Sequence, residues 1–389
     1  MRRQTRQAPA YKPLIPLGKL LGRIALRYRS AKPEPLHLPS IVLCNHTTNW
    51  DPILVAVSFR DALSFVASEH ILHWGVFSRI ISAIAHPIIR RKATVAAATA
   101  LQIARTIRAG GHVCIFAEGD RTFNGVTGPF FTATAKLVRM TGAQLVTFRL
   151  EGGYFSSPRW SDTLRKGKFY GHEVNRYSPE TLKAMSTEEI DACIARDLHE
   201  DAYARQRQSP VRYRGKRLAE SLETALYFCP RCGGLGTLKS EGNRLHCTCG
   251  LQAEYTQTGF LRGMEPPFDT VYGWDAWQRE ELKRRLDTVV LSDPDAALLQ
   301  TAEDGSSIQL ASGTLRMQKD ALSVDEERIP MENISAMSIC GRCELVFSTA
   351  ETSYEIRRET PYNAYKYRTM FELLHQSLPG KTPASPIAG

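Results

Sequence analysis

Between residues 40 and 150, short apolar runs alternate with segments whose apolar positions recur at helical spacing. The expected strands lie at 41–44, 63–67, 112–117 and 144–150, and the expected helices at 52–59, 71–85, 94–109 and 132–140. Gly110 and Gly111 fit the end of a helix just before a strand. Strands that alternate with helices are typical of an α/β domain, in which helices flank a sheet. We therefore predict that residues 36–175 form the core of an α/β domain.

The pattern changes beyond residue 150. Helical spacing at 178–200 and 213–226 predicts a helical extension over 176–224. After a cysteine-rich stretch at 225–262, short alternating strands are expected at 289–291, 308–310, 314–317, 336–339, 344–347 and 354–356, followed by an amphipathic helix at 364–378. Several strands closed by one helix resemble a pleckstrin-homology-like barrel. We expect this β-rich domain over 285–378 and a disordered tail at 379–389.

The segment 14–29 has the pattern of a basic amphipathic helix. Its apolar positions are Leu17, Leu20, Leu21, Ile24 and Tyr28, and its cations on another face are Lys19, Arg23 and Arg27. Such a helix can lie in a membrane interface with its cations on lipid phosphates. It can also pack on its own domain or belong to a transit peptide, and the pattern leaves these alternatives open. We describe residues 1–35 as a membrane-facing arm.

The positive charge of the chain is concentrated in this arm. The protein has 50 basic and 40 acidic residues, and residues 1–40 contain nine basic residues against one acidic residue. The remainder is nearly neutral, which favours an anionic membrane surface over nucleic acid as partner. No segment is expected to span a membrane or to act as a secretory signal. The expected location is therefore cytoplasmic, peripheral on the inner face of the membrane.

The first chemical candidate directly follows the expected strand 41–44. His46 and Asp51 are five residues apart, so they do not share a helix face and meet only across a turn. In that arrangement the Asp51 carboxylate holds the Nδ1 proton of His46 and leaves Nε2 as a general base. The alternative is that Asp51, followed by Pro52, caps the next helix and His46 is an ordinary loop residue.

The second candidate is the stretch 116–122, which also follows an expected strand. Gly119 permits a tight turn, and Arg121 offers a planar fork for phosphate oxygens. Glu118 is expected to orient that arginine or to accept a substrate hydroxyl. Because sites of α/β proteins collect at strand ends, we expect the two stretches to form one site.

These residues resemble the glycerolipid acyltransferase family. His46 and Asp51 match the family's His-four residues-Asp motif. Residues 116–122 match its Phe-Pro-Glu-Gly-Thr-Arg-Ser motif, with Ala117 and Asp120 in place of proline and threonine. A family motif that ends in arginine resembles residues 87–90, with Arg91 as a possible substitute for Arg90. The family's Val-Pro block corresponds to residues 145–148, without the proline. The resemblance covers about residues 20–175.

The resemblance implies an acyltransferase that moves a fatty acyl chain from acyl-CoA or acyl-carrier protein to a lysophospholipid hydroxyl. The acceptor that the resemblance favours is 1-acylglycerol-3-phosphate, and the product is then phosphatidic acid. His46 is then the catalytic base, and Glu118, Gly119 and Arg121, with Arg90 or Arg91, hold the acceptor phosphate. The helix at 71–85 lines an acyl tunnel, enters the bilayer or belongs to the core. The competing interpretation is a non-catalytic lipid-binding or scaffold protein on a degenerate acyltransferase fold.

Four cysteines form a separate candidate site. Cys229, Cys232, Cys247 and Cys249 fall within a short stretch, and in a reducing compartment clustered cysteines are first interpreted as metal ligands. Four thiolates predict a structural zinc ribbon with no open coordination position. The second cysteine pair is one residue closer than usual, so His246 is an alternative ligand. A further Cys-x-x-Cys at 340–343 is interpreted as incidental.

Overall fold

The computed structural model describes residues 12–68, 87–90, 96–130, 133–301 and 306–376. The chain divides into two compact units. The first contains residues up to Arg159 together with Leu164–Arg214, and the second contains Trp160–Thr163 and the residues from Gly215 onward. Trp160 is fully buried, and its ring centroid lies 5.4 Å from that of Tyr255. The expected helix at 71–85, Arg91 and the tail at 379–389 lie outside the described residues.

The first unit is built on a seven-stranded sheet with the order β1-β7-β6-β2-β5-β3-β4. The strands are β1 (Tyr28–Ser30), β2 (Ser40–Cys44), β3 (Leu63–Ser68), β4 (Ile88–Arg90), β5 (His112–Phe116), β6 (Gln144–Glu151) and β7 (Phe169–Tyr177). The pairs around β2 are parallel, whereas β6 and β7 are antiparallel. All five residues of β2 are buried, which explains its continuous apolar run. The expected α/β sheet is confirmed, with β1, β4 and β7 as additional strands.

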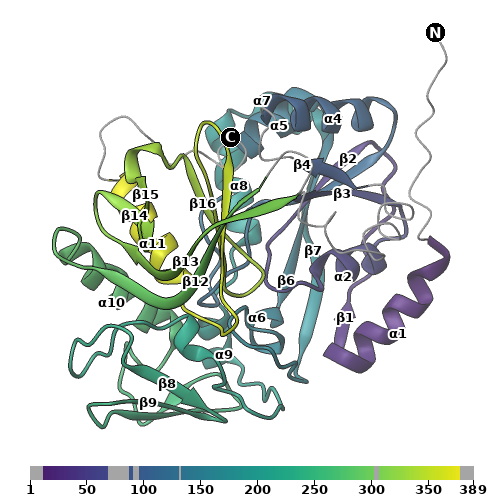
Figure 1. The fold of residues 1–389 in the computed structure, drawn as a ribbon. Helices are drawn as coiled ribbons and strands as arrows, with labels where there is room; N and C mark the ends of the chain where they lie inside the picture. The colour runs from purple at the N-terminus through teal and green to yellow at the C-terminus, as the bar shows by residue number, and fades with distance from the viewer. Residues whose placement is uncertain (1–11, 69–86, 91–95, 131–132, 302–305, 377–389) are drawn as a thin grey trace. The chain divides into compact units, whose positions relative to one another are not determined.

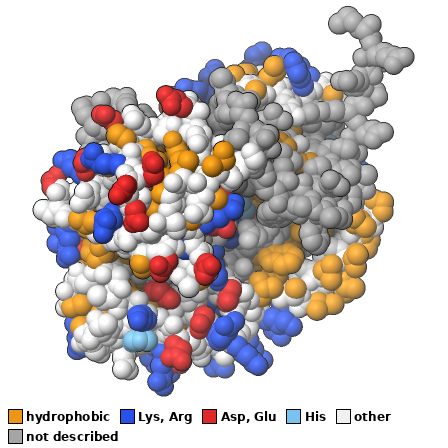
Figure 2. All heavy atoms as spheres, in the orientation of Figure 1, with side chains coloured by type: hydrophobic (Ala, Val, Ile, Leu, Met, Phe, Trp, Pro, Cys, Tyr) orange, Lys and Arg blue, Asp and Glu red, His pale blue; other side chains and the backbone are white. Residues whose placement is uncertain are grey.

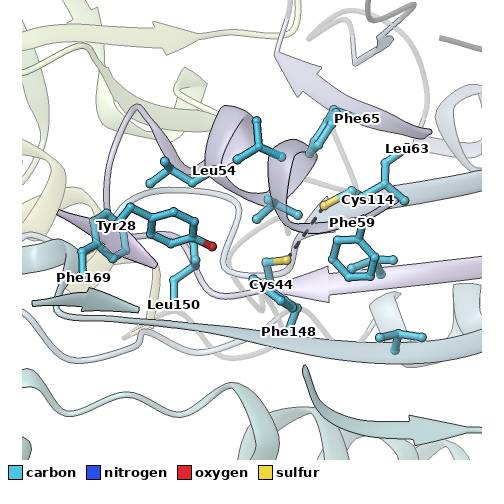
Figure 3. Packing of buried hydrophobic residues seen from close by; sticks show 14 of the residues in the cluster. Tyr28, Cys44, Leu54, Phe59, Leu63, Phe65, Cys114, Phe148, Leu150 and Phe169 are labelled. Carbon is cyan, nitrogen blue, oxygen red and sulfur yellow. Dashed lines mark hydrogen bonds between the residues drawn. The ribbon is translucent and has the colours of Figure 1, made fainter. Parts of the chain in front are cut away.

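Helices cover both faces of this sheet (Figure 1). The helices of the first unit are, in chain order, α1 (Ile15–Leu26), α2 (Asp51–Ser58), α4 (Ala96–Arg108), α5 (Ala133–Thr141), α6 (Gly153–Ser156), α7 (Pro179–Ala184), α8 (Thr187–Leu198) and α9 (Ala202–Gln208). On the α1 and α2 side, Leu54 packs with Cys44, Phe148 and Phe169 in one apolar cluster (Figure 3). The opposite face packs against α4, α5 and α8.

The segment after β7 differs from its expected form. The single helix predicted at 178–200 is two helices, because Ser186 and Glu189 form a capping box that starts α8. Both α7 and α8 bury apolar side chains against the sheet, so the first unit extends to Arg214, beyond the predicted core of 36–175. The helix predicted at 213–226 is wrong: this segment consists of turns and one 3-10 turn, Leu222–Thr224.

The second unit contains two antiparallel sheets. The smaller has the order β11-β10-β9-β8 and consists of β8 (Leu238–Glu241), β9 (Arg244–Cys247), β10 (Gln252–Tyr255) and β11 (Leu261–Arg262). Helix α10 (Val271–Arg284) follows it. The larger has the order β15-β14-β13-β12-β18-β17-β16 and is followed by α11 (Ala364–Gln376). Its strands are β12 (Leu291–Thr301), β13 (Ser307–Met317), β14 (Ala321–Val324), β15 (Glu327–Pro330), β16 (Ala336–Cys340), β17 (Glu344–Ser348) and β18 (Ser353–Arg357).

The expected β-rich C-terminal part with a closing helix is confirmed, but its strands are longer than predicted. Strand β13 is continuous where two strands were expected. Strand β12 extends ten residues beyond the strand predicted at 289–291. Pro294 and a left-handed Asp295 (φ 55°) interrupt the alternation of β12 at a bulge. This irregularity concealed the strand in the sequence pattern.

Candidate functional site

The loop between β2 and α2 brings His46 and Asp51 together. His46 lies two residues after Cys44, the last residue of β2, and Asp51 is the first residue of α2. Nδ1 of His46 lies 2.9 Å from Oδ2 of Asp51. The Asp51 side chain is fully buried, whereas 19% of the His46 side chain is exposed. The imidazole is therefore held at one nitrogen by a buried carboxylate while part of the ring remains accessible.

The carboxylate of Asp51 is held by the loop itself. The backbone N–H groups of Thr47 and Thr48 donate to Oδ2 at 2.6 and 2.8 Å, and the Thr48 hydroxyl donates to Oδ1 at 2.6 Å. These donors precede the helix, so the Asp51 side chain orders the loop and His46, and does not fit the alternative in which it caps α2.

Glu118 connects the loop after β5 to the loop between β2 and α2, residues 45–50, which we call the histidine loop. Oε1 accepts from the backbone N–H of His46 at 2.6 Å, and Oε2 accepts from that of Gly128 at 2.9 Å. Burial raises the pKa of Glu118 to about 8, against the opposing effect of these two donors. The turn at Gly119 has φ 71° and is closed by its N–H bond to the Phe116 carbonyl. Both described hydrogen bonds of Glu118 are therefore with backbone N–H groups. Neither of them is with the Arg121 side chain, which Glu118 was expected to orient.

Two further residues position His46. The ring of Phe116 stacks on the imidazole, with centroids 4.3 Å apart. The fully buried amide of Asn45 donates to the Leu150 carbonyl at 2.9 Å and accepts from the Leu150 N–H at 2.8 Å. The ends of β2 and β6 are thereby fixed beside each other. Neither role was predicted, although an asparagine directly after a buried strand is itself a signal, since a buried amide needs partners.

The loop after β5, which carries Arg121, lies next to the histidine loop. The backbone N–H of Thr122, directly after Arg121, donates to the carbonyl of His46 at 3.2 Å. The side chain of Arg121 is partly exposed. The structure thus brings the loop that contains Glu118, Gly119 and Arg121 beside His46, through bonds to the backbone of His46. Arg90 ends β4, which pairs with β3.

The helix α1 has an unusual orientation for a surface helix of a globular protein. Its glycines face α2: a Cβ atom at Gly18 would lie 2.6 Å from Cγ1 of Val57, so the close approach of the helices requires glycine. Most of its large apolar side chains are exposed instead, although Leu26 at its end is buried, and Trp50 and Ile53 near the start of α2 are exposed as well. The exposed apolar side chains of α1 are Leu17, Leu20, Leu21 and Ile24, and Leu14 directly before the helix is exposed as well. Figure 2 shows apolar side chains gathered over α1.

The four predicted cysteines gather in the second unit. The Sγ atoms of Cys229, Cys232, Cys247 and Cys249 all lie within 4.8 Å of one another. Cys229 and Cys249 are 3.7 Å apart, and Cys232 and Cys247 are 3.8 Å apart. Tetrahedral zinc with Zn–S bonds of about 2.3 Å requires sulfurs about 3.8 Å apart, so the donor set fits such an ion.

Glycine turns hold both cysteine pairs. The N–H of Gly233 donates to the Cys229 carbonyl, and the N–H of Gly250 donates to the Cys247 carbonyl. Both glycines have positive φ, 64° and 88°. The tight second turn brings Cys247 and Cys249 together despite their short spacing. His246 is not among the clustered donors in the described residues.

Comparisons with known proteins bear on the first unit. Residues 26–151 match the family model described as acyltransferase. No curated protein sequence matches the chain. Among solved structures, a 1-acyl-sn-glycerophosphate acyltransferase, PlsC, from Thermotoga maritima is similar, with 17% identity over 51% of this chain and 79% of that chain and a TM-score of 0.43. The N-terminal PH domain of human ARAP2 has 18% identity over 25% of this chain and 89% of its own, with a TM-score of 0.20.

Within the described residues no helix is long and apolar enough to cross a membrane. The matched residues begin at the end of α1 and end at the last residue of β6. They include the histidine loop, the Glu118 turn and Arg121. The α/β domain of this chain is thus acyltransferase-like over residues 26–151, which form part of the first unit.

Proposed function

We propose that this protein is an acyltransferase that moves a fatty acyl chain from acyl-CoA or acyl-carrier protein to the hydroxyl of a lysophospholipid. The acceptor we favour is 1-acylglycerol-3-phosphate, and the product is then phosphatidic acid. The observation that carries the proposal is the contact of 2.9 Å between His46 Nδ1 and the buried carboxylate of Asp51, inside a segment that matches acyltransferases.

In the proposed reaction, Nε2 of His46 removes the proton from the acceptor hydroxyl. The hydroxyl oxygen attacks the thioester carbonyl, the C–S bond breaks, and the thiolate takes the proton from the imidazolium. Asp51 holds Nδ1–H throughout and stabilises the imidazolium electrostatically. The stacked ring of Phe116 limits rotation of the imidazole. No covalent acyl-enzyme is required.

In this proposal Arg121 holds the acceptor phosphate, with Arg90 or Arg91 as a second cation. Replacing Arg121 with alanine should raise the Michaelis constant for a phosphate-bearing acceptor by about 10-fold or more, because a charge-assisted contact is worth about 1.5–3 kcal/mol. The Michaelis constant for the thioester should change little. Steady-state kinetics with each substrate varied in turn tests this, and an equal loss toward both substrates would show that Arg121 is structural.

We also propose that α1 binds the inner face of the membrane as a peripheral anchor. The support is its inverted orientation, with glycines packed on α2 and leucines exposed, and its flanking cations Lys19, Arg23 and Arg27, all of which are exposed. Apolar side chains can then enter the interface while the cations contact anionic headgroups. An anchor at α1 would hold the first unit, which also contains His46 and Asp51, at the membrane where the lipid acceptor is found.

Replacing Leu17, Leu20 and Ile24 together with serine should strongly reduce binding to vesicles of phosphatidylcholine and phosphatidylglycerol. Each buried apolar side chain contributes about 1.5–3 kcal/mol at most, so three together change the partition coefficient by orders of magnitude. Co-sedimentation with vesicles measures the loss. The matched control replaces the exposed Leu164 and Ile308 with serine, which should not alter sedimentation. Unchanged binding of the triple variant would contradict the anchor.

For the cysteine cluster we propose one structural zinc ion. The four thiolates fit its size and tetrahedral geometry, and four sulfur ligands leave no open position for a substrate. When bound, the ion would supply cross-linking of the two cysteine turns. The residues of this chain then hold the ribbon of β8–β11 in place.

The decisive experiment is an acyl-transfer assay with radiolabelled acyl-CoA and acyl-carrier protein across a panel of lysophospholipids. We expect formation of a diacylated product, fastest with 1-acylglycerol-3-phosphate. Vesicle binding without transfer to any acceptor would instead favour a lipid-binding or scaffold protein. Transfer to a different headgroup would retain the acyltransferase proposal and correct the acceptor.

A further inference from the structure

Arg159 is a buried cation beside the loop that carries Arg121. Only 2% of its surface is exposed. Its Nη1 lies 2.5 Å from Oδ1 of Asp120, and the same nitrogen donates to the backbone carbonyl of Arg121 at 3.1 Å. Its guanidinium carbon lies 4.3 Å from the centroid of the Phe123 ring. A buried guanidinium is unfavourable unless it is paired, and these contacts pair it.

Asp120 completes a clamp around the peptide of Arg121. Its Oδ1 accepts the backbone N–H of Arg121 at 2.8 Å as well as the ion pair from Arg159. The N–H of Arg121 is thus held by Asp120, and its carbonyl is held by Arg159. Since the following residue, Thr122, is bonded to the His46 carbonyl, Arg121 is fixed between Arg159 and the histidine loop.

We propose that Asp120 and Arg159 are positioning residues that set the affinity of Arg121 for the acceptor phosphate. The inference rests on the proposed function, in which Arg121 binds that phosphate. A fixed backbone reduces the conformational freedom that Arg121 loses when its planar fork engages phosphate oxygens. Arg159 lies outside residues 26–151, so the part of the chain that matches acyltransferases does not contain it.

The electrostatics of the pair assign it a second effect. Asp120 is next to the phosphate-binding arginine and is about one-third exposed, so an unpaired carboxylate here would repel the acceptor phosphate. The positive charge of Arg159 compensates this carboxylate from the buried side. The motif that the sequence resembles has an uncharged threonine at this position. Asp120 and Arg159 therefore act as a pair in this chain.

The test compares the single variant Arg159→Met with the double variant Arg159→Met/Asp120→Thr. In Arg159→Met, Asp120 loses the compensating charge of Arg159, and the Michaelis constant for 1-acylglycerol-3-phosphate should rise about 10-fold or more. The second substitution removes the repelling charge and should restore part of that loss. The thioester Michaelis constant should stay within about twofold of the wild type in both variants. A pair that acts only as a staple for the loop gives no such recovery.

The matched control is Arg176→Met, which removes another paired arginine of the first unit, bonded to Glu173 at 2.8 Å. It should leave both Michaelis constants unchanged. If Arg159→Met does not fold by circular dichroism, Arg159→Lys replaces it. A lysine ammonium keeps the compensating charge but lacks the fork and the flat face for Phe123, so the acceptor Michaelis constant should rise in the same direction but by less than in Arg159→Met.

The possible failures are distinguishable. If the wild-type protein transfers acyl chains but the Arg159 variants affect both substrates equally, or Asp120→Thr gives no recovery, the positioning role is overturned and the proposed function stands. If the wild type transfers to no acceptor, the proposed function falls, and the inference falls with it.

Discussion

Replacing His46 with alanine should reduce acyl transfer by about 100- to 10,000-fold, the usual contribution of a positioned general base. The geometry supports so large an effect because the imidazole is fixed by a buried carboxylate at 2.9 Å and by the stacked Phe116 ring. The assay is the turnover number with saturating acyl donor and lysophospholipid. Asp51→Asn should also lower turnover, since the amide no longer stabilises the imidazolium.

The control for this prediction is His37→Ala, which removes an exposed histidine of the same unit. It should leave turnover unchanged. Circular dichroism and thermal unfolding must show that the His46 variant is folded, because the backbone of His46 also bonds Glu118 and Thr122. A folded His46→Ala protein with normal turnover would rule out His46 as the base.

Removal of metal should have the second large effect. We expect one zinc per chain in protein purified without chelator, as measured by elemental analysis. Structural zinc sites contribute about 10–16 kcal/mol of binding free energy, which is also folding free energy of the segment around them. Chelation, or the double substitution Cys229→Ser and Cys247→Ser, should therefore unfold residues 225–262 first. Hydrogen exchange measured by mass spectrometry follows this local opening.

The second Cys-x-x-Cys supplies the matched control. Cys340 and Cys343 flank the turn between β16 and β17 and are not part of the cluster of four sulfurs. Replacing both with serine should leave the zinc content at one per chain. Zinc that persists after Cys229 and Cys247 are replaced would contradict the proposed ligands. Acyl transfer should fall only as far as the ribbon supports the fold, since no thiolate takes part in the proposed reaction.

The sequence pattern correctly predicted the elements that consist mainly of apolar residues. β2 and α2 are apolar over nearly their whole length, and their predicted bounds agree with the structure within one residue. β7 was missed because His172, Glu173 and Arg176 interrupt its apolar positions. Glu173 and Arg176 bond each other instead of packing in the core. Such a strand is recognised by its pairing with β6 and not by its own pattern.

The helix predicted at 213–226 failed for a local reason. Arg217 and Ser221 both adopt the left-handed conformation, with φ of 52° and 69°, which interrupts a helix. Helical spacing of the apolar residues 218, 222, 225 and 226 gives no sign of these backbone angles. Their burial arises in turns of the second unit. Spacing alone therefore cannot separate a buried turn from a helix.

The candidate site was predictable where its residues are close in sequence. His46 and Asp51 share one loop, and Glu118 to Arg121 share another, so each group is visible as a short motif. Asn45 bonds Leu150 across 105 residues, and Arg159 reaches Arg121 across 38 residues. Partners at such separation have no spacing rule. Their roles follow only from the folded arrangement of strand ends and loops.

Trp160 has a consequence for the order in which the chain is made. This fully buried residue belongs to the second unit and packs on Tyr255, although its neighbours in sequence, Arg159 and Leu164, belong to the first unit. On the ribosome it emerges roughly ninety residues before Tyr255, and at about 5–20 residues per second this leaves on the order of 5–20 s without its partner. The indole therefore lacks its contact with Tyr255 until the cysteine ribbon is synthesised, and we expect a chain truncated before the ribbon to bind chaperones more readily at this aromatic side chain.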